Sequence, residues 1–344
     1  ANYPDVSWQK TTMKNIGLDF YLLSDRISGS FDFFRNDITR LLGYASTSPL
    51  AIYETRPING GHYYRRGWEL MVDTKNLVGE FTWDTSLTFS KTNSFWKERL
   101  PNYDYQIYQQ RENEPMSAYY YYNVTGIINT DRSNMPESQK TLQAEAQLPG
   151  CPIIEDKNKD GKIDENDVYM KDNSPAIYVG IGNTFTYKRF EFSFFMYGQF
   201  GIQKYNIAYS AAQAGPLAVD YPENSNKFAY RLWNSQTNPN GSRPGLTIGK
   251  MGALPGNAWV NADRENASFM RMRNITLAYN LAGNILGSLQ RYVRNIKVYV
   301  DAQNPFILTK FQGFDPEIYT GGGGASGGSR GEYPQTRTFS LGAN

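Results

Sequence analysis

The sequence lacks several features that mark common functional classes. Its 344 residues include one cysteine, Cys151, and one histidine, His62. A single cysteine forms no internal disulfide. With one cysteine and one histidine, zinc sites built on several His or Cys side chains are excluded. A Ser-His-Asp catalytic triad is also poorly supported by a sequence with one histidine. The formal net charge of +2 indicates neither a nucleic-acid partner nor an acidic tail. Cys151 lies in the loop-like stretch LPGCPII, so we expect an unreactive thiol.

Long apolar runs are also missing. No stretch of 18 apolar residues occurs, which excludes spanning helices. It does not exclude a spanning barrel, because barrel strands are apolar only at alternate residues and average out as polar. The mean hydropathy of −0.58 is compatible with that pattern.

Aromatic residues and alternating strands are what the sequence does contain. There are 26 Tyr and 31 Gly, and 15% of the residues are aromatic. In NIKVYVDAQN, Ile296 and Val298 alternate with Lys297 and Tyr299, which predicts a strand because successive side chains point to opposite faces. By this criterion we expect about nine strands, at roughly 11–22, 26–40, 67–76, 81–94, 175–187, 190–203, 267–279, 295–309 and 335–344.

The gaps between these strands sort by length. Short turns on one rim and long loops on the other are typical of outer-membrane barrels. We therefore expect an all-β fold, an antiparallel transmembrane β-barrel segment over residues 1–344, with long extracellular loops and short periplasmic turns. A soluble antiparallel β-domain with one wet face has the same alternation and stays open as an alternative. The short gaps include 23–26, 76–80 and 187–189, and the long ones are about 42–66, 95–174, 204–266 and 310–334.

The stretch DKNKDGKIDEND, at 156–167, has the spacing of an EF-hand calcium loop. Gly161 stands at the sharp turn and Ile163 at the apolar position, and alternate oxygen ligands on such a loop converge on one point. The flanks are not amphipathic helices, so we expect a structural Ca²⁺ site that stiffens the 95–174 loop, with a solvated acidic turn as the alternative. The candidate ligands are Asp156, Asn158, Asp160, the Lys162 carbonyl, Asp164 and Asp167.

Seven segments follow one another along the chain: WQKTTMKNIGLDFYLLSDRISGSFDFFRNDITRLL (8–42), RGWEL (66–70), SAYYYYNVTGII (117–128), DKNKDGKIDENDV (156–168), SFMRMRNITLAYNL (268–281), IKVYVDAQNPFILTKFQGFDPEI (296–318) and YPQTRTFSLGAN (333–344). Together they resemble the SusC/RagA-type TonB-dependent outer-membrane transporters. The resemblance runs along nearly the whole chain, with the closing segments similar to the carboxyl end of that family.

The resemblance implies a function and partners. Such transporters are 22-stranded barrels with an amino-terminal plug and a TonB-binding segment, and they import glycans or oligopeptides with a SusD-like lid lipoprotein. Nine is an odd number of strands and no plug is evident, so we expect the last part of the barrel, with contact to the TonB complex made by an amino-terminal part outside this sequence. The expected location is the bacterial outer membrane, in contact with lipid. No nucleic-acid partner and no enzymatic activity are expected.

Other features support weaker expectations. Asp19, Asp84, Glu191 and Asp301 fall on the polar side of the predicted strands and would line a lumen. The tyrosines of AYYYYN (118–123) and GHYYRR (61–66) would contact substrate or lid, or else pack within the loops. The carboxylates of FDPE (314–317) alone are too little for acid-base catalysis. The alternative function is a soluble or surface-attached calcium-dependent glycan-binding β-protein.

Overall fold

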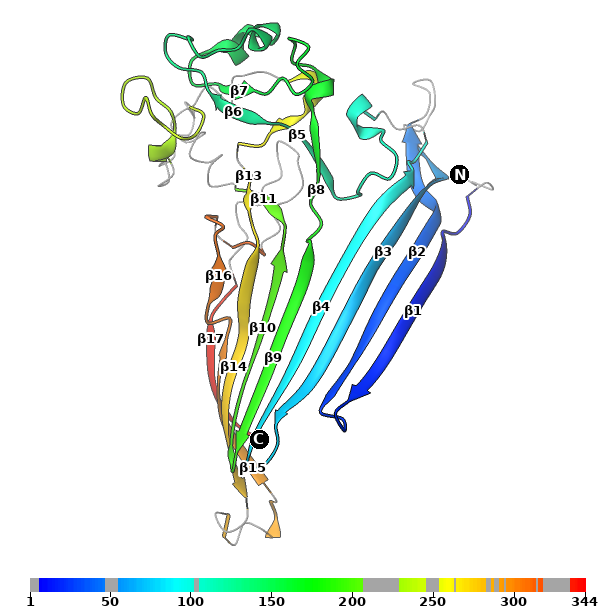
Figure 1. The fold of residues 1–344 in the computed structure, drawn as a ribbon, viewed down its shortest axis with the longest axis vertical. Coiled ribbons are helices and arrows are strands. Elements are labelled where there is room, and N and C mark those ends of the chain that lie inside the picture. Colours follow the sequence, from blue (N-terminus) through cyan, green and yellow to red (C-terminus); the bar gives the residue numbers. More distant parts are fainter. Residues whose placement is uncertain are drawn as a thin grey trace.

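The structure is a computed structural model that describes residues 6–46, 55–101, 105–206, 229–245, 254–262, 264–282, 286–287, 291–293, 295–313, 315–317 and 335–344. Figure 1 shows a tall, curved β-sheet with a lobe of connecting segments at one end and tight turns at the other. None of the helices in the described residues has the length and apolar character needed to cross a membrane.

The main sheet has ten strands, and nine of them lie side by side in the order in which they occur along the chain. All of their pairings are antiparallel. This confirms the predicted antiparallel all-β fold of about nine strands. β1 and β17 are the two edges, so the described strands form an open sheet rather than a closed barrel. The strands are β1 (Lys10–Leu22), β2 (Ile27–Ser46), β3 (Thr55–Leu77), β4 (Phe81–Glu98), β9 (Ile177–Tyr187), β10 (Phe190–Phe200), β14 (Phe269–Ala282), β15 (Asn295–Gln303), β16 (Ile307–Thr309) and β17 (Thr338–Ala343).

The predicted long loop at 42–66 is wrong. The ladder between β2 and β3 continues to the pair Ser46 and Thr55, so most of that range is strand. The only break in the ladder is at Arg40 and Gly61, both with positive φ (58° and 73°). Sequence alternation missed the extension because Gly, Pro and polar residues interrupt it there, whereas backbone pairing with an existing strand continues through them.

The predicted strand at 295–309 is two strands. β15 pairs with β14 up to Gln303, and β16 pairs with the other end of β14 from Ile307 onward. Between them Asn304 has a positive φ of 49°. Its side-chain amide donates to the Thr336 carbonyl at 3.1 Å, which fixes the turn against the segment that leads into β17.

The lobe is formed by the two longest connections, which fold together. Their parts meet in small sheets, since β5 pairs with β8 and with β12, β6 with β7, and β11 with β13. The stretch SAYYYYNVTGII therefore supplies β5 and β6 of the lobe and no strand of the main sheet. The lobe elements are β5 (Ala118–Tyr122), β6 (Val124–Ile127), β7 (Pro152–Ile154), β8 (Tyr169–Asp172), β11 (Gln203–Tyr205), β12 (Trp259–Val260), β13 (Arg264–Asn266) and the 3-10 helices η1 (Ile107–Gln109), η2 (Glu137–Thr141), η3 (Ala144–Gln147), η4 (Glu165–Asp167), η6 (Ala229–Arg231) and η8 (Pro255–Asn257).

The lobe has its own hydrophobic core. Tyr122, Ile128, Cys151 and Val168 are fully buried there, and Leu254 joins them from the second connection. Cys151 is enclosed and its thiol donates to the Glu145 carbonyl at 3.3 Å. Burial of this set from two connections makes the lobe a packed unit rather than a group of separate loops.

Candidate functional site

One face of the main sheet is apolar from strand to strand. The register places Leu70 opposite Phe31 on one side and Phe89 on the other, so the three side chains share a face. The same alignment continues to the far edge of the sheet. The side chains on this face, here called the apolar band, include Ile16, Leu18, Phe31, Phe33, Leu70, Leu87, Phe89, Ile181, Phe192, Leu277, Val300 and Leu341.

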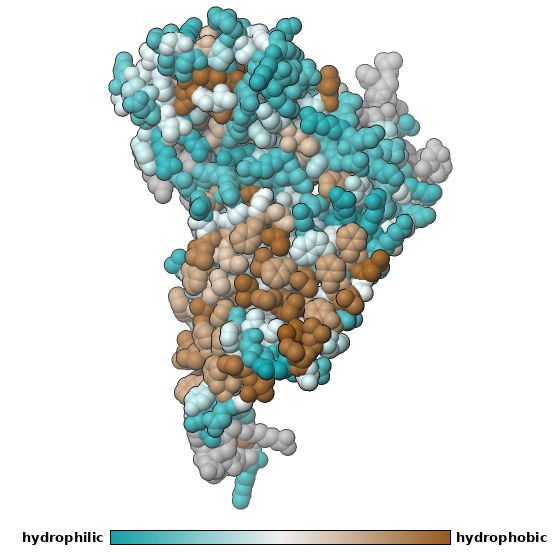
Figure 2. Space-filling view, in the orientation of Figure 1, coloured by the Kyte–Doolittle hydropathy of each residue, from teal (hydrophilic) through white to brown (hydrophobic). Residues whose placement is uncertain are grey.

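The apolar band is exposed. Ile16 and Leu341 are each 78% exposed, and Leu277 in the middle of the sheet is 50% exposed. Figure 2 shows a hydrophobic zone across the strands, beneath a largely hydrophilic lobe. Soluble monomers rarely expose a contiguous apolar surface of this kind, whereas the outer wall of a membrane barrel requires one.

The opposite face of the sheet is polar and charged. Asp19, Asp84, Glu191 and Asp301, which were predicted to line a lumen, all lie on it. The Thr276 hydroxyl donates to Asp301 Oδ1 at 2.6 Å. The Lys297 ammonium forms a salt bridge with Glu191 Oε1 at 2.8 Å. These contacts hold the carboxylates of this face in fixed positions.

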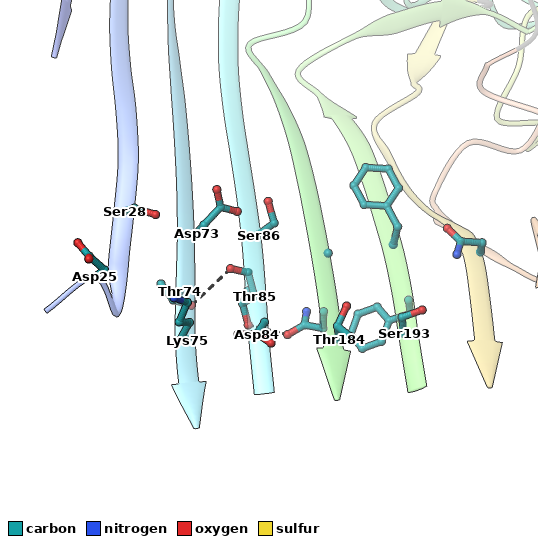
Figure 3. A pocket seen from close by; sticks show the side chains of 15 residues that line it. Asp25, Ser28, Asp73, Thr74, Lys75, Asp84, Thr85, Ser86, Thr184 and Ser193 are labelled. Atoms are coloured by element: carbon teal, nitrogen blue, oxygen red, sulfur yellow. Dashed lines mark hydrogen bonds between the residues drawn. The ribbon is translucent and has the colours of Figure 1, made fainter. Parts of the chain in front are cut away.

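A recess of about 390 Å³ lies near the turn end of the sheet. Its polar lining comes from side-by-side strands and from the turn between β1 and β2, as Figure 3 shows. Asp25, Asp73 and Asp84 supply carboxylates and Lys75 supplies an ammonium group. Such a surface offers hydrogen-bond donors and acceptors to a polar solute and contains an excess of acidic groups.

A buried ion network on the polar face was missed by the sequence analysis. Arg271 on β14 binds both carboxylate oxygens of Asp315 at 2.7 Å and also pairs with Glu317. The Tyr197 hydroxyl donates to Glu317 at 2.5 Å. Arg271 and Asp315 are 3% and 7% exposed. The two acids of FDPE, Asp315 and Glu317, therefore fix a loop base to the sheet, and Phe314 of the same stretch lies outside the described residues. The acids were visible in the sequence, but no local pattern pointed to the arginine 44 residues away.

The predicted calcium loop folds around its glycine. Gly161 has a φ of 83°, and its N–H donates to Asp156 Oδ2 at 2.9 Å. The Asn158 amide donates to Asp160 Oδ2 at 3.0 Å, so the first three candidate ligands lie together. Asp156 Oδ1 is enclosed and has no hydrogen-bond partner. An unpartnered buried carboxylate oxygen beside other oxygen donors suits a hard cation.

The end of the loop is organised differently. Both carboxylate oxygens of the buried Asp167 accept backbone N–H groups, Oδ1 from Lys157 at 2.8 Å and Oδ2 from Asp164 at 2.9 Å. Asp164 in turn caps η4 by accepting from the Asn166 N–H. Lys162 contributes its N–H to Asp160 Oδ1 at 2.9 Å. Across the described residues, no three His, Cys, Asp or Glu side chains form a group that could hold a metal ion.

The loop is nevertheless built into the lobe. Ile163 is 4% exposed and belongs to the lobe core. The Tyr122 hydroxyl donates to the Asp164 carbonyl at 2.9 Å and lies 3.0 Å from the Pro255 carbonyl, so it bridges the two connections. Burial raises the pKa of Tyr122, and the carboxylates of Asp167 and Glu165 raise it further, so the phenol stays protonated and able to donate.

The tyrosines of the two tyrosine-rich stretches are buried or half-buried. Tyr122 is buried in the lobe, and Tyr64 is buried against Phe95 with ring centroids 5.3 Å apart. Tyr121 stacks between Tyr119 and Tyr169. These contacts favour packing for most of the tyrosines. Most of the long loop predicted at about 310–334, including the Gly-rich residues 319–330, lies outside the described residues.

Comparison with known proteins gives one consistent result. The chain is 25% identical to the TonB-dependent receptor P3 of Formosa agariphila over 361 aligned residues, which cover 99% of this chain and 34% of that receptor. It is 27% identical to the TonB-dependent receptor SusC of Bacteroides thetaiotaomicron, covering 98% of this chain and 32% of SusC. The fold matches a chain of the RagAB peptide importer in its closed-closed state with a TM-score of 0.72 at 18% identity, over 100% of this chain and 36% of that chain. No family model matches.

The resemblance to SusC/RagA-type TonB-dependent transporters is confirmed. The likeness extends along almost the whole chain, which spans about a third of the length of these relatives. The open antiparallel sheet thus has the fold of about a third of the matched RagAB chain. The relatives bear the names of receptors and of an importer, and none of these names describes an enzyme.

Proposed function

We propose that this chain forms part of the barrel wall of a TonB-dependent importer in the bacterial outer membrane, and that the importer takes up oligosaccharides or oligopeptides. The observation that carries the proposal is the pair of faces on one sheet. The apolar band is exposed on one side, and acids and hydroxyl groups occupy the other. Lipid on the first face and a polar solute on the second account for both.

The orientation follows from the lengths of the connections. The β1–β2, β3–β4 and β9–β10 turns are short, whereas the lobe lies at the opposite end of the strands (Figure 1). In outer-membrane barrels the long connections lie outside the cell, so we place the lobe at the cell surface. There it would meet a SusD-like lid lipoprotein, and contact with TonB would be made through an amino-terminal part. The likeness to SusC and to RagAB supports both partners.

Cysteine accessibility in cells tests the two faces. Phe192 and Ser193 are neighbours on β10, with Phe192 on the apolar band and Ser193 on the polar face. Each is replaced by cysteine in the full-length protein, and whole cells are treated with a small membrane-impermeant maleimide. Ser193→Cys should react with the maleimide and Phe192→Cys should not, and the enclosed Cys151 should not react in either variant.

The same experiment addresses the alternative, a soluble or surface-attached calcium-dependent glycan-binding protein. In such a protein the apolar band would have to be covered by protein or the molecule would aggregate. Recovery of the full-length protein in buffer without detergent, with both cysteines equally reactive, would overturn the importer proposal.

We also propose that the 156–167 loop binds Ca²⁺ as a structural ion. The unpartnered Asp156 Oδ1, together with the oxygens of Asn158 and Asp160, supports the start of the site. At Asp167 both carboxylate oxygens already accept backbone N–H groups, so an ion there would share or replace those hydrogen bonds, whereas at Asp164 Oδ1 accepts one. Asp at the last position is shorter than the usual Glu, so we expect weak affinity, at the level of extracellular calcium modules.

Terbium luminescence measures this binding directly. Tb³⁺ bound near the tyrosines of the lobe should be sensitised by ultraviolet excitation, and Ca²⁺ should displace it. Asp156→Ala should abolish the signal, whereas Asp131→Ala, at an exposed acid elsewhere in the lobe, should leave it unchanged. A signal equal in the two variants would refute a site in this loop.

A further inference from the structure

A row of basic side chains borders the apolar band on its lobe side. The register places Arg35 opposite Lys14 on β1 and opposite Arg66 on β3. Lys91 on β4 lies opposite Trp68, which is two residues nearer the turns than Arg66 on β3. We call Lys14, Arg35, Arg66 and Lys91 the basic row. Each is an even number of residues from a member of the apolar band on its own strand, so all four share its face.

The charges of the basic row are poorly compensated. Cross-strand neighbours lie about 5 Å apart between Cβ atoms, and like charges directly opposite one another are destabilising. Arg35 is paired with Asp37 at 2.9 Å. Among the described residues, Lys14, Arg66 and Lys91 have no carboxylate within 4.0 Å. An anion on this surface would relieve the repulsion.

Aromatic rings hold two of the cations in place. The Arg35 guanidinium lies 4.3 Å from the centroid of the Tyr64 ring, and the Arg66 guanidinium lies 5.1 Å from the centroid of Phe95. Tyr64 and Phe95 stack on each other. The Nε–H and a terminal N–H of Arg35 donate to Asp37 at 2.9 and 3.1 Å, so Arg66 is the arginine of this pair that offers its N–H edge to an anion. Because its guanidinium rests on a ring, Arg66 loses little side-chain freedom when the anion binds.

We propose that the basic row binds the phosphate groups of anionic lipids in the leaflet on the lobe side of the membrane. The inference rests on the proposed function, because it requires the apolar band to lie in lipid. Side chains immediately beyond an apolar band lie at the level of the lipid headgroups, where Lys and Arg favour anionic lipid. Arginine also binds phosphate through two parallel N–H groups.

Trp68 provides a local probe, since it lies on the same face beside Arg66 and Lys91. The full-length protein is placed in vesicles of phosphatidylcholine with either brominated phosphatidylcholine or brominated phosphatidic acid. The quenching of Trp68 fluorescence by the brominated lipid is taken as the difference between the protein and its Trp68→Phe variant. Phosphatidic acid should quench several-fold more effectively than phosphatidylcholine at equal content. The double variant Lys14→Gln/Arg66→Gln should lose most of that preference, because each charge removed lowers the affinity for an anionic lipid by about fivefold.

Two controls and two outcomes complete the test. Lys14→Arg/Arg66→Lys keeps the charges and should retain the preference, as should Arg65→Gln, which neutralises the neighbouring arginine on the opposite face. Equal quenching by both lipids in the unaltered protein, or a preference that survives in Lys14→Gln/Arg66→Gln, would overturn the lipid site alone. Absence of quenching by either lipid would instead overturn the proposed membrane location.

Discussion

A charge placed on the apolar band should destabilise the protein in a membrane far more than the same charge one residue away. Leu87 and Ser86 are neighbours on β4. Leu87 lies between Val72 and Ile181 on the apolar band, and Ser86 lines the recess on the polar face. We therefore compare Leu87→Arg with Ser86→Arg in the full-length protein.

The magnitude follows from the depth of Leu87 in the band. On β4 the band runs from about Phe81 to Lys91, ten residue steps or roughly 33 Å of strand at about 3.3 Å per residue. A tilt of about 40° projects this to roughly 25 Å, which is the height of the lipid-facing zone of such barrels. Leu87 is near its middle, where Arg costs about 2–4 kcal/mol. Ser86→Arg faces a polar recess beside Asp73, so we expect a change below about 1 kcal/mol.

Urea unfolding in lipid vesicles measures both variants. The difference of about 3 kcal/mol corresponds to a change of roughly 100-fold in the folding equilibrium. In detergent micelles, which adapt to a polar side chain, the difference should shrink. If Ser86→Arg proves as costly as Leu87→Arg in vesicles, or if the two exchange order, the assignment of the faces is incorrect.

Three further predictions concern the lobe and the loop base. Arg271→Ala leaves Asp315 buried without its partner and should lower the stability of this loop base by about 3–5 kcal/mol. Hydrogen exchange at 315–317 should become faster, and unchanged exchange would contradict the role of Arg271 in fixing the loop base to the sheet. Ile163→Ala removes a core side chain of the lobe and should cost about 2–5 kcal/mol, seen as protease cleavage in 156–167 at a lower temperature. Tyr122→Phe should cost about 1–3 kcal/mol in the same assay, because the carbonyls that its hydroxyl contacts lose a donor. Equal sensitivity in Tyr21→Phe, at an exposed position of β1, would show that the effect is not specific to the bridge.

Local alternation predicted the main sheet well where each strand has one apolar and one polar face. β1, β9 and β10 begin and end within a few residues of the expected positions. Prediction failed between 42 and 66, where the strands continue through Gly and Pro residues because their partners hold them. It also failed at Asn304, where one expected strand divides between two positions on β14.

In the candidate calcium loop, too, the local turn was predictable from the sequence and the contacts with distant residues were not. The spacing of Asp156, Asn158 and Asp160 around Gly161 was evident from the sequence, and the turn forms as expected. That Asp167 satisfies backbone N–H groups, and that Ile163 packs into a core shared with residues near 254, depended on contacts distant in the chain.

The order of residues alone determined the alternating strands, the short turns and the two longest connections, the glycine turn of the acidic loop and the family resemblance, because each of these is a local or sequential property of the chain. Only the tertiary structure decided that the apolar side chains of successive strands align into one exposed band, that two long connections share a core, and that Arg271 meets Asp315. Those outcomes depend on strand register and on packing between distant segments, and a shift of one residue in register would have turned each strand's apolar side chains to the other face.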